Sequence, residues 1–315
     1  METTRENYDA LLEEVMREIP PKPEQRQPMD KETWAAAQKA QREELYALAD
    51  QVAGRALSDP AALRQFIETQ ARLGGESAAN TLILMERYPK AARVHTFEEW
   101  KRMGRSIRPG EQALSLLARG REYVREDGAT GVFMRIRKVF DVRQTTGRAI
   151  KQRPIHGEYN RIKALLTDTP VPVCLSEEVP ATVGAVYLPE QGVVNVARGL
   201  EGKALFFSAA RELARESGCQ STFLCDCVAN ILCSRYHMEP HYPDRIPETY
   251  ANLEPKAKRA VLADIRQVAW LIERYGPEPG QVSQSPGKAA GYPGALGGKP
   301  WNPNTSSKWM KASGG

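Results

Sequence analysis

The chain has 315 residues, more than a usual single domain, which favours two domains with terminal segments. With 41% hydrophobic and 26% charged residues, the composition is globular and excludes a fibrous or wholly disordered chain. No run approaches the ~18 continuous apolar residues of a membrane-spanning helix, so no membrane partner is expected. Four of the five cysteines lie within residues 219–233 rather than forming a spread disulfide framework, which favours a reducing cytoplasm.

The net charge of +5 is unevenly distributed along the chain. Residues 87–153 contain 17 Lys and Arg against 7 Asp and Glu, a local net charge of +10, so the remainder carries −5. A basic segment attracts polyanions, of which nucleic acid is the commonest in a cytoplasm. A solubilising basic surface explains the same excess.

Helical patterns with capping residues, glycines and prolines at their ends dominate the first ninety residues. The predicted helices cover Thr3–Ile19, Asp30 towards Gly54, Pro60 to Gly74, and Ser77 to Pro89. A proline-rich linker, Pro20-Pro21-Lys22-Pro23, follows the first helix because proline ends it. Residues 1–29 are therefore predicted to form an N-terminal helix and linker.

From residue 96 the pattern becomes mixed. Thr96 begins a capped helical turn, Pro109-Gly110-Glu111 predicts a tight turn, and Ala113–Ala118 predicts a buried strand. Arg121–Arg125 and Gly131–Val142 are expected to pair as a hairpin around 126–128.

Side chains of the second hairpin strand are expected to divide between two faces, because successive strand residues point to opposite sides. The even-numbered positions are mostly apolar, whereas Phe133, Arg135 and Arg137 share the other face. One face is therefore predicted to be core and the other cationic with an aromatic.

The second half begins at a boundary predicted near residue 153. We expect a hairpin of Val183–Leu188 and Gly192–Ala197, followed by three helices. These helices cover Leu200–Ser217, Ser221–Tyr236 and Pro255–Tyr275. In 276–315, 15 of 40 residues are Gly or Pro, which predicts a disordered tail. The predicted domains are thus 30–153 and 154–275.

Three stretches, Ala79–Leu84, Pro89–Val94 and Thr96–Glu111, resemble the N-terminal domain of ArdC-type antirestriction proteins, as does the later Lys138–Thr146. Related sequences are the LtrC-like proteins of conjugative elements. The similarity covers roughly residues 66–147. It implies an α+β fold, a helical N-terminal region with a small mixed sheet, that binds single-stranded DNA in a mobile genetic element.

Single strands are bound by cationic grooves together with aromatic faces that stack bases. The candidate nucleic-acid-binding residues are Trp100, Lys101, Arg105, Arg108, Arg119, Tyr123, Phe133, Arg135 and Arg137. The helical spacing of Phe97 and Trp100 favours the core for Trp100, whereas Phe133 on the arginine face is the better stacking candidate. Asn80 and Glu111 are expected to have capping or turn-holding roles.

The second half resembles the zincin-like C-terminal domain of the same family. Active members carry His-Glu-x-x-His on the helix that reads Ala210-Arg211-Glu212-Leu213-Ala214-Arg215 in this chain. By this resemblance, Arg211 and Arg215 occupy the histidine positions, Glu212 keeps the general-base position, and Asp226 best matches the third ligand.

Arginine cannot replace histidine as a zinc ligand, because a guanidinium has five donors and no acceptor. We therefore expect no metal and no cofactor, and Glu212 then has no hydroxide to generate. Arg211 and Arg215 are expected to pair with Asp226 and also with Glu212, while solvent-facing arginines or an anion site are the alternatives. The clustered cysteines lack Cys-x-x-Cys spacing and predict buried thiols.

The sequence thus predicts a cytoplasmic α+β protein: a single-stranded DNA-binding module followed by a zincin-like domain without catalysis. The first alternative is a metallopeptidase with a rearranged site. The second is an interaction protein whose pseudo-protease domain binds a host factor. No phosphate loop of the Gly-x-x-x-x-Gly-Lys type is present, so an NTPase is not expected.

Overall fold

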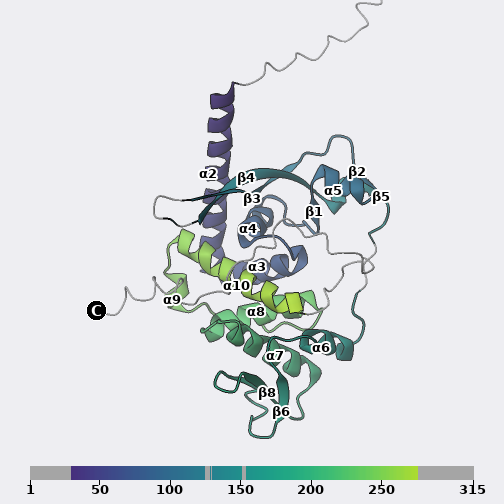
Figure 1. Ribbon diagram of the computed structural model, residues 1–315, viewed down its shortest axis with the longest axis vertical. Helices are drawn as coiled ribbons and strands as arrows, with labels where there is room; N and C mark the ends of the chain where they lie inside the picture. Colours follow the sequence, from purple (N-terminus) through teal and green to yellow (C-terminus); the bar gives the residue numbers. More distant parts are fainter. Residues whose placement is uncertain (1–29, 125–127, 129, 151–153, 276–315) are drawn as a thin grey trace, which may run out of the picture. The chain divides into compact units, whose positions relative to one another are not determined.

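The computed structural model describes residues 30–124, 128, 130–150 and 154–275 (Figure 1). The predicted N-terminal helix and linker and the predicted disordered tail lie outside these residues. The chain divides into two compact units, residues 1–41 and 42–315. The division into domains at residue 153 stays a prediction.

The predicted helices of the described N-terminal part are confirmed, with their caps. Helix α2 (Lys31–Ala56) begins after Asp30, whose Oδ1 accepts the amides of Glu32 and Thr33 at 2.9 Å. Helix α3 (Pro60–Leu73) is capped by the Asp59 carboxylate, and α4 (Ala78–Arg87) by the Ser77 hydroxyl. Such side chains satisfy amides that have no partner within the helix.

A long hairpin dominates the next segment. Its strands, β3 (Leu114–Val124) and β4 (Thr130–Asp141), pair antiparallel, and the short β1 (Val94–His95) pairs with the other edge of β4. The remaining elements here are α5 (Phe97–Arg102), β2 (Arg105–Ile107), η1 (Val142–Gln144) and β5 (Thr145–Gly147), with β2 paired to β5. Thr96 and Glu99 form a reciprocal capping box on α5, as the predicted turn required.

The sequence predicted two separate strands where the structure has only β3, and this is a correction. The strand continues through a register shift between Arg119 and Glu122. Gly120 lies in this irregularity, and a Cβ there would approach the Phe133 carbonyl oxygen to 2.7 Å. The close backbone approach requires glycine, so the strand bulges instead of ending.

The predicted division of β4 into a core face and a cationic face is also only partly correct. Val139 lies on the odd-numbered face and is fully buried, as is Leu116, which pairs with Arg137. Leu114, the partner of Val139, is partly buried against the same core. Helix α4 packs against β3. The supposed cationic face is therefore core at this end and exposed at the end near the turn.

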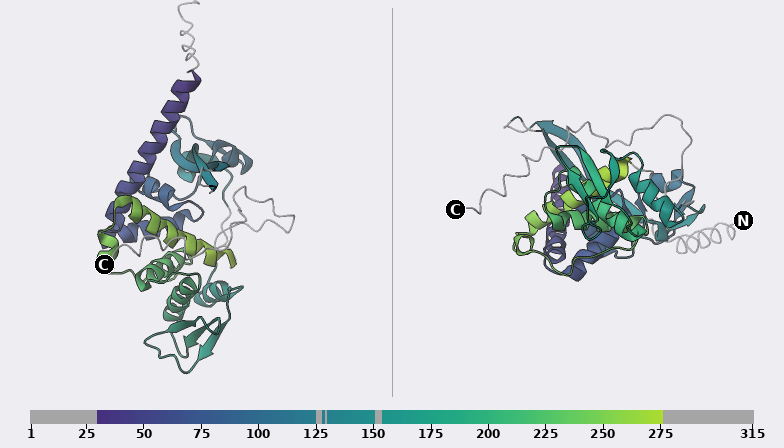
Figure 2. Two further views of the ribbon diagram at one scale, coloured as in Figure 1. Left: turned by 60° about the vertical axis from the view of Figure 1, so that its left-hand side comes forward. Right: turned by 90° about the horizontal axis from the view of Figure 1, so that it is seen from below.

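The second half contains the predicted hairpin, β7 (Ala185–Leu188) with β8 (Val193–Ala197), and the three predicted helices. The helices are α7 (Gly202–Glu216), α8 (Thr222–Arg235) and α10 (Pro255–Tyr275). The elements that the sequence did not predict are α6 (Glu158–Leu166), β6 (Val173–Ser176) and α9 (Glu248–Ala251). Strand β6 pairs in parallel with β8 (Figure 2).

Helix α8 is central to the apolar core. It packs against α3, α7 and α10, and α10 also contacts α4. Phe66, Phe206 and Leu213 are among the largest fully buried side chains of this core. The fold is α+β, as expected, whereas the zincin-like character of the second half stays a prediction. Within the described ranges, no helix combines the length and apolarity needed to cross a membrane.

Candidate functional site

Two exposed aromatic side chains lie together near the turn of the β3–β4 hairpin. Tyr123 is 40% exposed and Phe133 is 59% exposed, and their ring centroids are 4.4 Å apart with an interplanar angle of 42°. Tyr123 pairs with Gly131, where a Cβ would lie 2.4 Å from the tyrosine ring. Glycine at this position therefore leaves room for the tyrosine ring beside Phe133.

Arg135 lies on the same face as this ring pair. It is two residues from Phe133 on β4, and alternate residues of a strand share a face. Its side chain is exposed and has no ion pair with any carboxylate in the described part of the chain. Tyr123, Phe133 and Arg135 are hereafter called the hairpin face.

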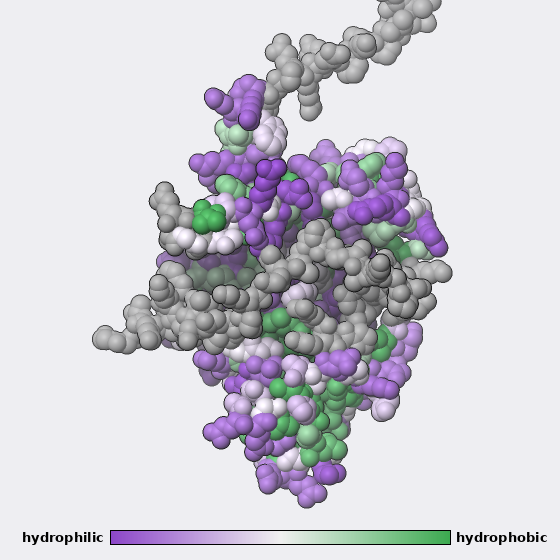
Figure 3. Space-filling view, viewed as in Figure 1, coloured by the Kyte–Doolittle hydropathy of each residue, from purple (hydrophilic) through white to green (hydrophobic). Residues whose placement is uncertain are grey.

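Arg119 lies on the opposite face of the hairpin, because it pairs with Met134. Its guanidinium is 3.6 Å from the Glu122 carboxylate, and both side chains are half exposed. The predicted cations therefore do not all line one surface. Lys101 is an exposed residue of α5. Hydrophilic residues gather over α5, β2 and β5 (Figure 3).

Trp100, a predicted stacking residue, lies in the core, which corrects that prediction. Its ring is fully buried, its Nε1 donates to the Phe140 carbonyl at 2.8 Å, and its edge contacts His95 with centroids 4.8 Å apart. The alternative that the helical spacing favoured is the one observed.

Three predicted cations are already engaged within the protein. Arg105 donates to Thr145 Oγ1 at 2.7 Å and to the Thr145 and Arg148 carbonyls, and so joins the ends of β2 and β5. Arg108 pairs with Glu111 at 2.7 Å. Arg137 pairs with Glu76 at 2.6 Å, an ion pair across 61 positions that the sequence did not signal.

Asn80 and Glu111 both have structural roles, but Asn80 satisfies a strand edge and not the helix cap or turn that was expected. The Asn80 amide donates to the Leu117 carbonyl and accepts the Leu117 N–H, each at 2.9 Å, and so satisfies the outer edge of β3. Glu111 accepts from Arg108 and from Gln144 Nε2 at 3.1 Å. Both residues hold the sheet in place.

On α7, Glu212 is the centre of a buried polar cluster. It is 4% exposed and accepts from the Nε atoms of Arg211 and Arg215, each at 3.1 Å, and from the Tyr187 amide at 3.0 Å. Arg211 also donates to the Val183 carbonyl at 3.0 Å. The cluster therefore ties α7 to strand β7 and to the residues preceding it.

Asp226 does not join this cluster, and the predicted pairing with Arg211 and Arg215 is wrong. Its carboxylate has no hydrogen bond or ion pair with either guanidinium, and the buried Oδ1 has no hydrogen-bond partner in the described residues. Burial raises the pKa of Asp226, although both arginines act to lower it. Glu212 pairs with both arginines on its own helix instead: it is adjacent to Arg211 and lies three residues before Arg215. The second spacing is one at which helical side chains meet.

The cluster does not fit a catalytic zinc ion. Both Glu212 oxygens already accept hydrogen bonds, and the two arginines offer donors only. No group of three His, Cys, Asp or Glu side chains in the described ranges is placed to hold a metal. The cysteines at 219, 225, 227 and 233 are buried thiols, as the spacing predicted.

Among solved structures, the chain is similar to the antirestriction protein ArdC of the R388 plasmid. The metal-free form shows 14% identity and a TM-score of 0.44, with 72% of this chain and 97% of that chain covered. The Mn(II)-bound form shows 15% identity and a TM-score of 0.43, with coverages of 68% and 95%. These structural neighbours are ArdC proteins. Both neighbours carry the name of the family that residues 66–147 resemble. No family model and no curated protein sequence matches the chain.

Proposed function

We propose that the chain is a non-catalytic single-stranded DNA-binding protein, and that the hairpin face binds the strand. The observation that supports this most directly is the exposed contact of Tyr123 with Phe133, next to Arg135. Exposed aromatic pairs are costly to leave in water unless they meet a partner. Unpaired bases are such partners, because every base has a π-face.

The chemistry of the hairpin face favours a single strand over a duplex. Duplex bases are stacked on one another and offer their faces to no side chain, whereas bases of a single strand are free to stack on Tyr123 and Phe133. Arg135 supplies a charge for a neighbouring phosphate. Because stacking on aromatic rings and a single phosphate contact do not depend on base identity, we expect the hairpin face to bind strands of any base sequence.

Fluorescence anisotropy with labelled single- and double-stranded oligonucleotides tests this proposal. Each base stacked on an aromatic contributes about 1 to 3 kcal/mol, so Phe133→Ala is expected to weaken single-strand binding about 5- to 150-fold. Tyr159→Ala is the matched control, because Tyr159 is an exposed aromatic on α6 outside the hairpin. Equal affinities of Phe133→Ala and wild type would exclude the hairpin face as the binding site.

The absence of catalysis is part of the proposal and is supported by the chemistry around Glu212. A zincin requires a Lewis acid to activate water, and the positions of its two histidines are held here by arginines that pair with the general-base candidate. Metal analysis of the purified protein is expected to show no stoichiometric zinc. Stoichiometric zinc together with peptide hydrolysis would favour the metallopeptidase alternative.

The biological setting is proposed from the resemblance of residues 66–147 to ArdC-type sequences. Mobile elements enter cells with DNA that is transiently single-stranded, and a coating protein protects that strand from restriction or assists its transfer. A cytoplasmic location follows from this proposal. Protection of single-stranded DNA from a nuclease by wild type, and its loss in Phe133→Ala, would tie the setting to the hairpin face.

A further inference from the structure

Glu76 lies in the connection between α3 and α4 and contacts both the helices and the hairpin. Its carboxylate pairs with Arg137 of β4 at 2.6 Å and accepts from Asn80 Nδ2 at 2.8 Å. Its backbone carbonyl accepts from Gln70 Nε2 at 3.1 Å and from Arg266 Nε at 3.0 Å. The position of this carboxylate is therefore fixed from several sides.

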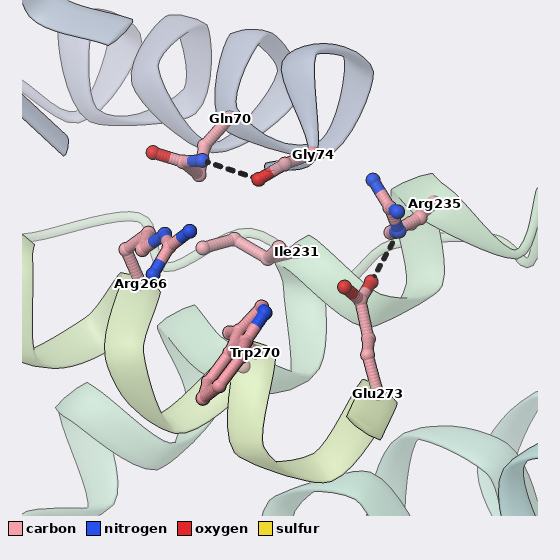
Figure 4. A pocket seen from close by; sticks show the side chains of 8 residues that line it. Gln70, Gly74, Ile231, Arg235, Arg266, Trp270 and Glu273 are labelled. Carbon is pink, nitrogen blue, oxygen red and sulfur yellow. Dashed lines mark hydrogen bonds and ion pairs between the residues drawn. The ribbon is translucent and has the colours of Figure 1, made fainter. Parts of the chain in front are cut away.

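Gly74, two residues before Glu76, lines a hollow between α3, α8 and α10 (Figure 4). Gln70 and Arg266 line this hollow, and Arg266 also donates to the Gly75 carbonyl at 2.9 Å. The Glu76 side chain is only 12% exposed. These contacts fix the Glu76 carboxylate at the position where Arg137 pairs with it.

Arg137 shares the strand face of Arg135 and Phe133, because the three residues alternate along β4. It is the next cation along the hairpin face in the direction of the core, and its side chain is 26% exposed. Its charge is offset by Glu76, whereas no described carboxylate offsets that of Arg135. Arg137 lies where this face passes from the exposed end into the core, and the exposed part of its side chain is the next cationic group that a strand bound at Arg135 can reach.

The bonding of Arg137 differs from that of a purely structural arginine. Arg105 donates to several neutral acceptors and joins two strands. Arg137 has Glu76 as its hydrogen-bond acceptor, and its buried Nε has no partner within the described residues. Carboxylate and phosphate oxygens present the same acceptor geometry to a guanidinium. A phosphate oxygen therefore offers Arg137 the same kind of acceptor that the Glu76 carboxylate supplies.

We propose that Glu76 is an internal competitor of nucleic-acid phosphate that withholds Arg137 from the bound strand. The inference rests on the proposed function of the hairpin face. In the wild-type protein, the nucleic acid contacts the hairpin face only. Because Glu76 pairs with Arg137, one phosphate fewer is neutralised than the two arginines of β4 could neutralise together. Glu76 thereby limits affinity for polyanions of any sequence.

Glu76→Gln tests this directly, because glutamine keeps the acceptor for Asn80 and removes the charge. For single strands, log affinity falls with log salt by about 0.7 per neutralised phosphate. The variant is therefore expected to have a slope steeper by about 0.7 and an affinity about 5-fold higher at 0.1 M salt. Glu76→Gln/Arg137→Gln is expected to return to the wild-type slope.

Glu86→Gln is the matched control. It changes the net charge equally and removes the carboxylate of an exposed ion pair with Arg55, remote in sequence from the hairpin. Its slope is expected to equal that of wild type. A slope for Glu76→Gln equal to that of Glu86→Gln, with the fold intact by circular dichroism, would overturn the proposal.

Two further results separate this inference from the proposed function. In the first, the salt dependence of log affinity for Arg137→Gln alone is shallower than that of wild type by about 0.7. This result would show that Arg137 already contacts a phosphate in the wild-type protein. It would overturn the role of Glu76 as a competitor and leave the proposed hairpin face unaffected. Unchanged binding in Phe133→Ala would instead remove the hairpin face itself.

Discussion

Removing the Glu212 carboxylate is expected to destabilise the protein, although the residue is charged and not part of the apolar core. Three donors, the Nε atoms of Arg211 and Arg215 and the Tyr187 amide, reach it within 3.1 Å. Glu212→Ala leaves a buried amide without an acceptor and two guanidinium groups without their counter-charge. Breaking a buried ion pair from one side costs about 3 to 5 kcal/mol. Because both arginines are partly exposed, the lower figure is expected.

Urea denaturation followed by circular dichroism measures this cost. About 3 kcal/mol also lowers the Tm by about 5 °C in a chain of this size, because the entropy of unfolding is about 2.1 cal/mol/K per residue. Glu212→Gln is expected to lose less than Glu212→Ala, because an amide oxygen still accepts the Tyr187 N–H.

Glu216→Ala is the control, since Glu216 lies one turn later on α7, half buried, and accepts only from Ser217 in the described hydrogen bonds. That variant is expected to lose under about 1 kcal/mol. If Glu212→Ala were no more destabilising than Glu216→Ala, the cluster would not tie α7 to β7 in energetic terms.

Three more outcomes are expected. The double variant Arg211→His/Arg215→His should bind zinc, with Asp226 as the third ligand. Metal analysis of the purified variant measures this. A metal-free variant would show that Asp226 is not positioned to act as a zinc ligand. Burial raises the pKa of Asp226 above its ordinary value of 3.8. The wild-type protein therefore loses stability as the pH rises above 3.8, because the buried carboxyl group must then lose its proton. Asp226→Asn lacks this loss and should be the more stable protein at neutral pH, as measured by urea titration. Equal stabilities at neutral pH would refute it. Gly74→Ala should cost about 1 to 3 kcal/mol by the same method, because Gly74 has φ 55° and its Cβ would lie 2.1 Å from Arg235 Nη1. Gly75→Ala, with nothing within 4 Å of its Cβ, is the control, and an equal loss in both would contradict the argument.

Local signals in the sequence determined most of the helices and their starts. Asp59, Ser77 and Thr96 each cap a helix through amides two or three residues away, so the interaction is complete within a short peptide. The exposure of Phe133 followed equally from alternation along one strand. Zinc ligation by Arg211 and Arg215 was excluded by the chemistry of the guanidinium group, whatever the fold.

Partners that are distant in sequence were decided only by the tertiary structure. The pairing of Glu76 with Arg137, the satisfaction of the β3 edge by Asn80 and the parallel pairing of β6 with β8 join residues that no periodicity relates. The exclusion of Asp226 was decided in the same way, because the packing of α8 against α7 leaves its carboxylate without a hydrogen bond to either guanidinium, whereas Glu212 is a neighbour of both arginines on α7. Sequence patterns indicate which polar groups need a hydrogen-bond or ion-pair partner. The identity of that partner depends on distances in the folded chain, because hydrogen bonds and ion pairs act over only a few ångströms.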